Sequence, residues 1–248
     1  MILLKRFFFL FVAISFTTSG QDAKEIISKA ENVIKGKTAH GTVEMTVVNP
    51  DFTRTLKMES WWQGNEKALI VIESPRREAG NKTLKIGNEM WNYLKNTETT
   101  IKIPPSMMLQ SWNGSDFTND DLVRESDLSD DYFQKITGEQ TIDGEKCWEI
   151  ELKPKPDAPV VWGKLHYYVR KSDNLPARVV YFDENGKPVR RMEFGDVKMM
   201  GGRKLPAAWK MISLTKEGHH TEFKMLDMEF DIKLKDRIFS FRELERGN

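Results

Sequence analysis

Apolar and polar residues alternate along most of the chain beyond residue 40. The alternation is clearest in 147–152, 164–170 and 226–234, where an apolar side chain occupies every second position. A period of two places these side chains on one face of a β-strand and the polar ones on the other. The pattern predicts about eleven strands, followed by two longer ones after residue 203. The eleven lie near 40–48, 53–63, 67–74, 82–87, 89–94, 98–103, 132–139, 146–153, 161–170, 177–183 and 188–199.

Turn-forming pairs separate the predicted strands. Asp143-Gly144, Asn185-Gly186 and Gly201-Gly202 favour tight hairpins. Because hairpins follow one another without long helices between them, the strands should form an antiparallel meander. A meander of this length curls around its apolar face. The sequence therefore predicts a mainly β fold, in which a strongly curved antiparallel sheet forms an incomplete, half-open barrel within a single domain, residues 21–248.

One long helix is predicted near the start of the chain, from Asp22 to Lys35. Asp22 can cap its first turn, Glu25 completes a box-like start, and Gly36 follows as a stop. The helix is amphipathic, so it must lie on an apolar surface, and we expect it to help close the open side of the barrel. Its apolar stripe consists of Ile26, Ile27, Ala30, Val33 and Ile34.

Residues 103–122 interrupt the strand pattern with large apolar side chains on a segment that is not strand-like. Pro104 and Pro105 end the preceding strand, because proline has no N–H for the sheet ladder. Ser106 is predicted to cap a short helical turn. Asn113-Gly114 reads as a turn, and the polar run 118–121 as a second helix start. The segment is either a loop folded onto its own core or a short helical lid that moves over an apolar cavity.

Residues 1–20 have the form of a secretory signal peptide, with Lys5 and Arg6 ahead of an apolar run and small residues at the end. The alternative is an uncleaved membrane anchor, although the run is short for a bilayer span. No cysteine follows the apolar run, so a lipid-modified N-terminus is not expected. The sequence predicts cleavage near Gly20 and export as a soluble protein.

Charge and cysteine content exclude several classes of protein. Without Lys5 and Arg6, the 38 basic residues fall to 36 against 37 acidic ones. A near balance argues against a nucleic acid partner, which requires a basic surplus. The single cysteine, Cys147, cannot form an internal disulfide, and its surroundings indicate a small apolar residue in a strand rather than a catalytic thiol.

Catalytic constellations are missing from the sequence. Gly114-Ser115-Asp116 lacks the spacing of a nucleophile elbow, and the adjacent carboxylates at 120–121 and 130–131 are typical of helix starts and solvated loops. No His or Cys spacing indicates a metal. The sequence therefore predicts no enzymatic activity, no metal and no cofactor. The four histidines are His40, His166, His219 and His220.

The segment P-P-S-M-M followed by S-W-N-G-S-D-F-T-N-D-D-L resembles the signature of the LolA-like outer membrane lipoprotein-sorting protein family, in the superfamily of the periplasmic carriers LolA and LolB. The similarity covers nearly the whole chain after residue 20. Two positions depart from the family pattern: Lys95 stands where Pro is usual, and Asn113 where Met is usual. Further matches are Ser74-Pro75, Ala79-Gly80, 89–93, Trp162-Gly163, 169–173, Leu175-Pro176, 201–204, Phe239-Ser240 and Leu244.

This resemblance implies a non-enzymatic periplasmic carrier that holds the acyl chains of a lipoprotein or lipid in an apolar cavity and moves its cargo towards the outer membrane. It also implies an inner-membrane transporter and an outer-membrane acceptor as partners, with the carrier itself a monomer. The 12 Met and 7 Trp residues suit such a cavity, because Met is flexible and polarizable.

Strand phase selects the residues expected to line the cavity. Arg54 and Arg76, near strand ends, either pair with polar groups of the lid, bind lipid headgroups or remain solvated surface charges. The lid is expected to contribute Met107, Met108, Leu109 and Trp112. The sheet is expected to contribute Leu56, Met58, Trp62, Ile70, Ile72, Trp91, Trp148, Ile150, Met228 and Phe230.

Three other functions fit parts of the sequence. One is an accessory subunit of an inner-membrane transporter that grips a protein segment. A second is a barrel that binds or hydrolyses small hydrophobic molecules. The missing nucleophile argues against hydrolysis. An outer-membrane barrel is the third alternative, and the long helix and the charged C-terminal end argue against it.

Overall fold

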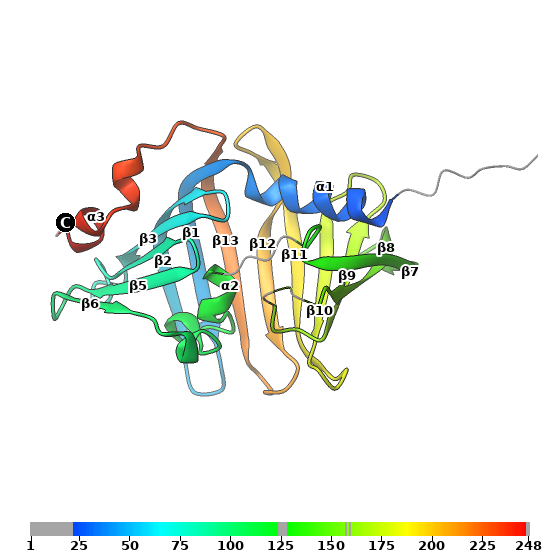
Figure 1. Cartoon of the computed structure of the whole chain (residues 1–248), viewed down its shortest axis with the longest axis horizontal. Coiled ribbons are helices and arrows are strands. Elements are labelled where there is room, and N and C mark those ends of the chain that lie inside the picture. Colours follow the sequence, from blue (N-terminus) through cyan, green and yellow to red (C-terminus); the bar gives the residue numbers. More distant parts are fainter. Residues whose placement is uncertain (1–21, 124–127, 157, 159, 247–248) are drawn as a thin grey trace, which may run out of the picture.

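The computed structural model describes residues 22–123, 128–156, 158 and 160–246. The predicted signal peptide, residues 1–20, lies outside this part of the chain. All thirteen strands belong to one antiparallel sheet that does not close into a barrel (Figure 1). In chain order they are β1 (Thr38–Val48), β2 (Thr53–Gln63), β3 (Lys67–Ser74), β4 (Lys82–Ile86), β5 (Glu89–Leu94), β6 (Thr99–Lys102), β7 (Tyr132–Ile142), β8 (Glu145–Pro154), β9 (Lys164–Arg170), β10 (Pro176–Phe182), β11 (Pro188–Met200), β12 (Arg203–Ser213) and β13 (His220–Phe230).

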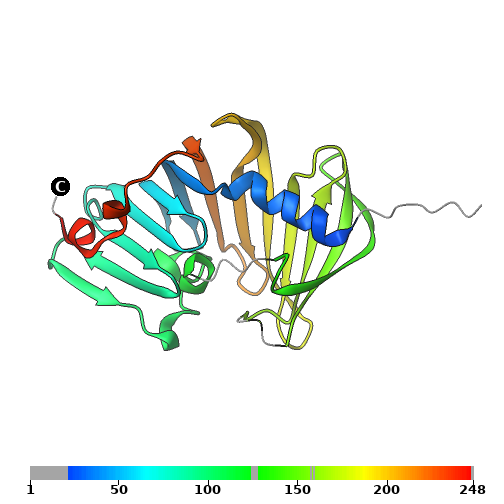
Figure 2. The same ribbon diagram turned by 45° about the horizontal axis from the view of Figure 1, so that its top comes forward.

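The sheet consists of two meanders joined at their inner strands. Its order is β6-β5-β4-β3-β2-β1-β13-β12-β11-β10-β9-β8-β7, so the first and last strands of the chain pair at the centre. The two open edges, β6 and β7, lie far apart (Figure 2). The predicted half-open barrel is confirmed, as are the thirteen strands. The pairing of β1 with β13 was not foreseen, because local turn signals report only on strands that are neighbours in sequence.

The central pair contains a close contact and an irregularity that help the sheet to bend. A Cβ atom at Gly41 of β1 would lie 2.1 Å from the backbone oxygen of Asp227 in β13, so only glycine fits there. The register between these strands shifts between Thr42 and Val43. Bulges of this kind increase the local twist and bend the strand.

The long helix α1 (Ala23–Lys35) lies across the concave face of the sheet (Figures 1 and 2). Asp22 caps it by accepting a hydrogen bond from the Lys24 N–H (3.0 Å), and Gly36 follows it with a φ of 65°. Its residues Ile26 and Ile27 are fully buried against the half of the sheet formed by β7 to β12. The predicted helix and its apolar stripe are confirmed.

The segment between β6 and β7 connects the two open edges of the sheet, and we refer to residues 103–123 as the strap. It contains two single 3-10 turns, η1 (Pro105–Met107) and η2 (Trp112–Gly114), and the short helix α2 (Asn119–Val123). Figure 1 shows it in front of the concave face. The prediction of a Ser106 cap was wrong, because Ser106 lies inside η1, which has no side-chain cap.

The C-terminal segment covers the opposite face of β3 to β5. It forms η3 (Asp236–Phe239) and α3 (Phe241–Glu245), and it buries Phe239 and Leu244 against the sheet. The buried Lys82 donates hydrogen bonds to the backbone oxygens of Glu243 (2.9 Å) and Arg246 (2.6 Å). Burial lowers the pKa of Lys82 below its usual value. Consequently, β3 to β5 carry apolar side chains on both faces.

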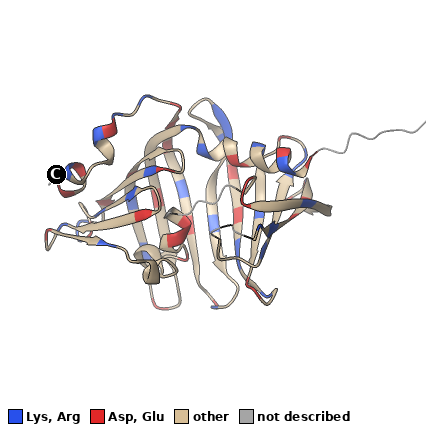
Figure 3. Cartoon of the chain, in the orientation of Figure 1, with Lys and Arg blue, Asp and Glu red and all other residues tan. Residues whose placement is uncertain are grey.

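Basic and acidic residues alternate along the ribbon rather than forming separate blocks (Figure 3). Among the described residues, none of the helices has the length and apolar character needed to cross a bilayer. Cys147 is a buried, unpaired cysteine in β8, as predicted.

Candidate functional site

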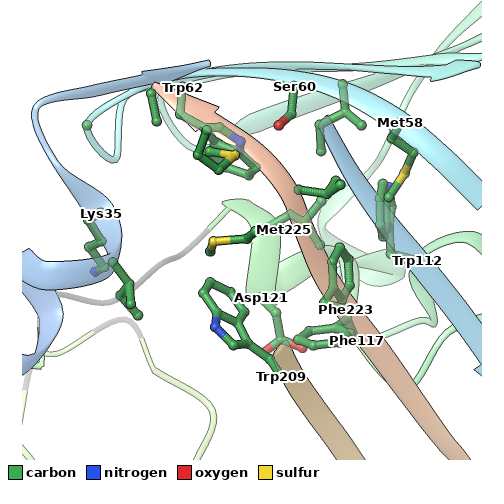
Figure 4. Close-up of a pocket in the computed structure, with 17 residues that line it drawn as sticks. Lys35, Met58, Ser60, Trp62, Trp112, Phe117, Asp121, Trp209, Phe223 and Met225 are labelled. Atoms are coloured by element: carbon green, nitrogen blue, oxygen red, sulfur yellow. The ribbon is translucent and has the colours of Figure 1, made fainter. Parts of the chain in front are cut away.

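Two cavities of about 190 Å³ each adjoin one another between the concave face, α1 and the strap. We call the first the apolar chamber; Figure 4 shows its lining. Its walls come from β1, β2, β3, β12 and β13, with the strap and the end of α1. The lining residues are Ile34, Lys35, Ala39, Val43, Met58, Ser60, Trp62, Gly64, Ile70, Trp112, Phe117, Asp121, Leu122, Trp209, Phe223, Met225 and Met228.

The second cavity, which we call the polar chamber, lies over β7 and β9 to β12. Tyrosines and carboxylates join the apolar side chains in its walls. Its lining residues are Glu31, Ile34, Lys35, Phe117, Asp120, Asp121, Leu128, Tyr132, Val160, Val161, Trp162, Leu165, Tyr167, Val179, Tyr181, Met192, Phe194, Trp209 and Met211.

Five residues line both chambers and define their junction: Ile34, Lys35, Phe117, Asp121 and Trp209. They come from the end of α1, the strap and β12. Phe117 is buried and packs edge-on against Phe223, with ring centroids 5.1 Å apart. The strap therefore divides a single concave groove into two connected parts.

The strand register brings flexible apolar side chains together in the apolar chamber. Val43 of β1 lies opposite Met58 of β2 and, on its other side, opposite Met225 of β13. Because directly opposed residues point to the same face, all three side chains meet on the concave side. Two of them are methionines, whose flexible side chains adapt to irregular guests.

An ion pair fastens α2 to the sheet beside the junction. Arg190 of β11 donates to an Asp121 carboxylate oxygen at 2.7 Å, and its guanidinium carbon lies 4.2 Å from the ring centroid of Trp162 and 4.4 Å from that of Tyr181. Burial by itself lowers the pKa of Arg190, but the charge and hydrogen bonds of Asp121 outweigh it and raise the pKa above its ordinary value. Removing either partner strands the other in an apolar setting.

Side chains of β2 and β13 also make polar contacts with the strap. Arg54 of β2 donates to the backbone oxygen of Asn113, so of the three alternatives for Arg54 the structure shows pairing with residues 103–122. The Thr221 hydroxyl of β13 donates to the Asp116 carboxylate at 2.8 Å. Beyond the strap, the Leu128 N–H donates to Glu31 of α1 at 3.2 Å. Arg76, in contrast, is exposed.

Five of the fourteen residues predicted to line a cavity do line the apolar chamber: Met58, Trp62, Ile70, Trp112 and Met228. Leu56, Ile72 and Met108 pack in the hydrophobic cluster behind its wall. Ile150 lies in the cluster beneath α1, and Phe230 in a third cluster at the centre of the sheet. These residues face the interior without reaching either cavity.

Four predicted residues lie elsewhere. Trp91 points to the opposite face, where its ring packs edge-on against Phe241 with centroids 5.0 Å apart. Trp148 is half-buried, with the Lys171 ammonium 3.6 Å above its ring centroid. Met107 is 37% exposed and Leu109 is 61% exposed on the outer side of the strap. None of the four lines either chamber: Trp148 packs against the cluster beneath α1. Trp91, Met107 and Leu109 were misplaced because strand phase fixes neither the face of a two-sided strand nor the side of a 3-10 turn.

None of the fourteen predicted residues lines the polar chamber or the junction. Phe117 lies within the sequence motif of the strap, so it could have been predicted to line a cavity. Trp209 and Phe223 belong to the two last strands, whose apolar residues alternate like those of any half-buried strand. Only the β1–β13 pairing brings them opposite Met58 and Trp112, and the sequence carries no local signal for that pairing.

The chambers contain no evident reactive constellation. In the described part of the chain, no group of three or more His, Cys, Asp or Glu residues is placed to hold a metal ion. Burial raises the pKa of the Cys147 thiol, which disfavours the reactive thiolate. Cys147 also packs with Ile142 and Ala177, in a cluster separate from those around the two chambers.

Comparison with known proteins agrees with this architecture. A family model described as uncharacterized protein-like matches residues 64–246. A search of curated proteins gave no match. A DUF1329 family protein from Desulfovibrio piger has a similar structure, with a TM-score of 0.80 and 22% identity, covering 90% of this chain and 97% of its own.

Two further structures are similar over comparable lengths. An outer membrane lipoprotein-sorting protein domain from Vibrio parahaemolyticus has a TM-score of 0.78 and 20% identity, covering 90% of this chain and 98% of its own. A LolA superfamily protein from Nitrosomonas europaea has a TM-score of 0.75 and 21% identity, covering 91% and 100%. The chain thus belongs to the family whose model spans residues 64–246, and its fold is the LolA-like half-open sheet that its sequence motifs predicted.

Proposed function

We propose that this protein is a non-enzymatic carrier that binds the acyl chains of a lipoprotein or lipid in the two chambers and moves its cargo through the periplasm towards the outer membrane. The observation that carries the proposal is the pair of connected cavities beneath the strap. Methionine and tryptophan line the apolar chamber, and a sheet with an ordinary core leaves no such space.

The energetic need for such a chamber is large. Transfer of an acyl chain out of water gains about 0.8 kcal/mol for each CH₂, so a long chain is worth on the order of 10 kcal/mol. A lipid therefore does not cross an aqueous gap unaided at a useful rate. A carrier supplies apolar surroundings on the way and releases its cargo when the cavity opens.

The size of the cavities requires movement on binding. Each holds about 190 Å³, whereas ligand pockets commonly span roughly 300–1,000 Å³. A long chain must therefore fill both chambers or displace side chains. The methionines can rearrange, and the strap is fastened by polar links that break and reform. We propose that the strap is the lid through which cargo enters.

Fluorescence titration tests cavity binding. N-phenyl-1-naphthylamine, a neutral dye that brightens in apolar surroundings, should bind the purified protein and be displaced by a synthetic diacyl lipopeptide. The tryptophans that line the chambers should change their emission in the same titration. If the dye does not bind and the lipopeptide leaves tryptophan emission unchanged, the carrier proposal is wrong.

Compartment and hand-over form part of the proposal. We infer cleavage of residues 1–20, delivery of the cargo by an inner-membrane transporter and its release to an outer-membrane acceptor. Fractionation of cells should recover the protein with periplasmic markers and with a mass lacking the first 20 residues. Recovery with the membrane fraction at full length would contradict this inference.

A further inference from the structure

Two neighbouring loops at one end of the sheet bring three exposed cations together. The first loop joins β3 to β4 and carries Arg76 and Arg77, and the second joins β5 to β6 and begins with Lys95. The Lys95 N–H donates to the side-chain oxygen of Asn81 at 3.0 Å. The Asn96 side-chain amide donates to the backbone oxygen of Arg77 at 3.5 Å. These bonds hold the two loops against each other, so their cations share one surface.

The positive charge of this surface is only partly balanced. Within the described ranges, no ion pair involves any of the three cations. Glu78 of the first loop pairs with Arg54 of β2 at 3.4 Å, and the exposed Glu98 is the other carboxylate on the two loops. Together with Arg54, the three make four cations against two carboxylates, which leaves an excess of two positive charges.

Exposed apolar side chains lie beside these cations. Leu94 of β5 is 39% exposed and Ile101 of β6 is 44% exposed. Both point to one face of the sheet, because Asn92 lies opposite Ile101 and two positions before Leu94. That face is the one the strap covers, since the Thr83 hydroxyl donates to Asn92 at 2.9 Å and accepts from the Trp112 ring N–H at 3.3 Å. The strap leaves this corner of the concave face uncovered.

We propose that this corner is a docking surface for a lipid bilayer rich in anionic lipids, and we call Arg76, Arg77, Leu94, Lys95 and Ile101 the basic rim. Surfaces that bind membranes peripherally combine apolar side chains, which enter the headgroup region, with cations that attract anionic headgroups. Each cation close to such a bilayer strengthens binding about fivefold. The basic rim provides three of them next to two apolar side chains.

The position of the basic rim gives docking a consequence for the strap. Arg54 contacts Glu78 on the first loop and donates to the backbone oxygen of Asn113 in the strap. A bilayer bound at the basic rim therefore lies next to the end of the strap that covers the apolar chamber. Docking by this surface does not depend on what the chambers hold, so it is tested separately from carriage.

A second group of exposed cations serves as the matched comparison. Lys233 and Lys235 lie in the stretch that leads into η3, whose segment covers the opposite face of the sheet. Two carboxylates, Asp231 and Asp236, flank them in sequence, and no strap residue contacts this stretch through a hydrogen bond within the described ranges. Removing these lysines lowers the net charge by as much as removing two arginines from the basic rim.

Flotation of the purified protein with vesicles tests the docking surface. Vesicles of dioleoylphosphatidylglycerol should bind the protein at least about tenfold more tightly than vesicles of dioleoylphosphatidylcholine at low salt, and high salt should remove most of the difference. Arg76→Ala combined with Arg77→Ala should weaken binding to the anionic vesicles at least about tenfold. Lys233→Ala combined with Lys235→Ala should weaken it less than about twofold.

Equal binding to the two kinds of vesicle would overturn the docking surface. An equal loss in the two double variants would also overturn it, because net charge alone would then explain adsorption. Thermal unfolding identifies a variant that fails to fold, and Lys95→Ala then decides, with an expected loss of about fivefold. Displacement of N-phenyl-1-naphthylamine by lipopeptide should be the same in all these variants, so loss of docking leaves the carrier function standing.

Discussion

Helix α1 and the strap both cover the concave face, but they differ in structure and in how they are attached. Helix α1 is a regular amphipathic helix with its own cap, and it buries Ile26, Ile27 and Ala30 completely. The strap has two 3-10 turns and a helix of only five residues, and it is fastened by Arg54, Arg190 and Thr221. Both covers bury apolar side chains, but the strap, which buries Met108, Trp112 and Phe117, lacks the regular helix of α1 and is also tied to the sheet by side-chain polar contacts.

This difference bears on how the molecule opens. Segments with few regular backbone hydrogen bonds open locally at a lower free energy than the elements around them. Breaking the strap's side-chain links exposes Phe117 and Trp112, which line the chambers. Detaching α1 instead would expose the largest hydrophobic cluster. We therefore propose that α1 has a structural role and that the strap controls access to the two chambers.

The largest difference in stability between α1 and the strap should appear when an aspartate replaces a buried apolar residue of each. Ile27→Asp puts a carboxylate in the core beneath α1 and should cost on the order of 5 kcal/mol, comparable with the whole stability of a domain. Met108→Asp, at a buried strap position, should cost about 1–3 kcal/mol because the strap can lift, and it should weaken retention of lipid. Chemical denaturation measures both. Unfolding by Met108→Asp as severe as that by Ile27→Asp would make the strap a fixed part of the core.

Removing the buried ion pair should have the next largest effect. Arg190→Met leaves the Asp121 carboxylate without its partner beside the chambers and should cost about 3–5 kcal/mol. The double change Arg190→Met with Asp121→Leu should recover most of that loss, because no charge is then stranded. Urea titrations of the single and double variants give the coupling energy. A double variant no more stable than Arg190→Met would argue against the ion pair as the anchor of α2.

Loosening the strap from β2 should be milder. Arg54→Ala removes the bond to the Asn113 backbone oxygen and should cost about 1.5 kcal/mol, since Arg54 remains partly solvated. Amide hydrogen exchange should accelerate in residues 105–118 and stay unchanged in α1. Arg76→Ala is the control, because Arg76 is exposed and its loss should change stability by less than about 0.5 kcal/mol. Faster exchange spread evenly over the sheet would contradict local opening.

The smallest contrast compares the caps of the two covering helices. Asp22 accepts from the Lys24 N–H, and Thr118 accepts from the Asp121 N–H. Asp22→Ala should lower global stability by about 1 kcal/mol. Thr118→Ala should change global stability less and instead speed exchange within the strap. Equal shifts in melting temperature, with no change in exchange of the strap, would show that both covers belong to one cooperative unit.

The regular elements of the fold could be predicted from the sequence better than its irregular parts. Alternation predicted all thirteen strands, and Asp22, the apolar stripe and Gly36 predicted α1, because these signals are local. The joining of β1 to β13 and the route of the strap between opposite edges depend on contacts distant in sequence. Trp91 was assigned to the wrong face because β5 is covered on both sides, by the strap and by α3.

The site was predicted in part. Met58 and Met228 were found because their strands have a clear alternation, and Trp112 because it lies in the recognised motif. The polar chamber escaped because Tyr132, Tyr167 and Trp162 look like ordinary core residues until the sheet curls. A cavity arises where elements distant in sequence do not pack fully against one another, so no local sequence pattern indicates it.

The central claim is that the two chambers hold an amphiphilic cargo. Mass spectrometry of lipids extracted from protein purified directly from the periplasm tests it most directly, with a variant in which Val43→Phe and Val179→Phe narrow both chambers as the comparison. The account predicts a lipid or acylated peptide in near-stoichiometric amount with the unaltered protein, and at least about tenfold less with the folded variant. No enriched amphiphile, or equal recovery from both proteins, would contradict it.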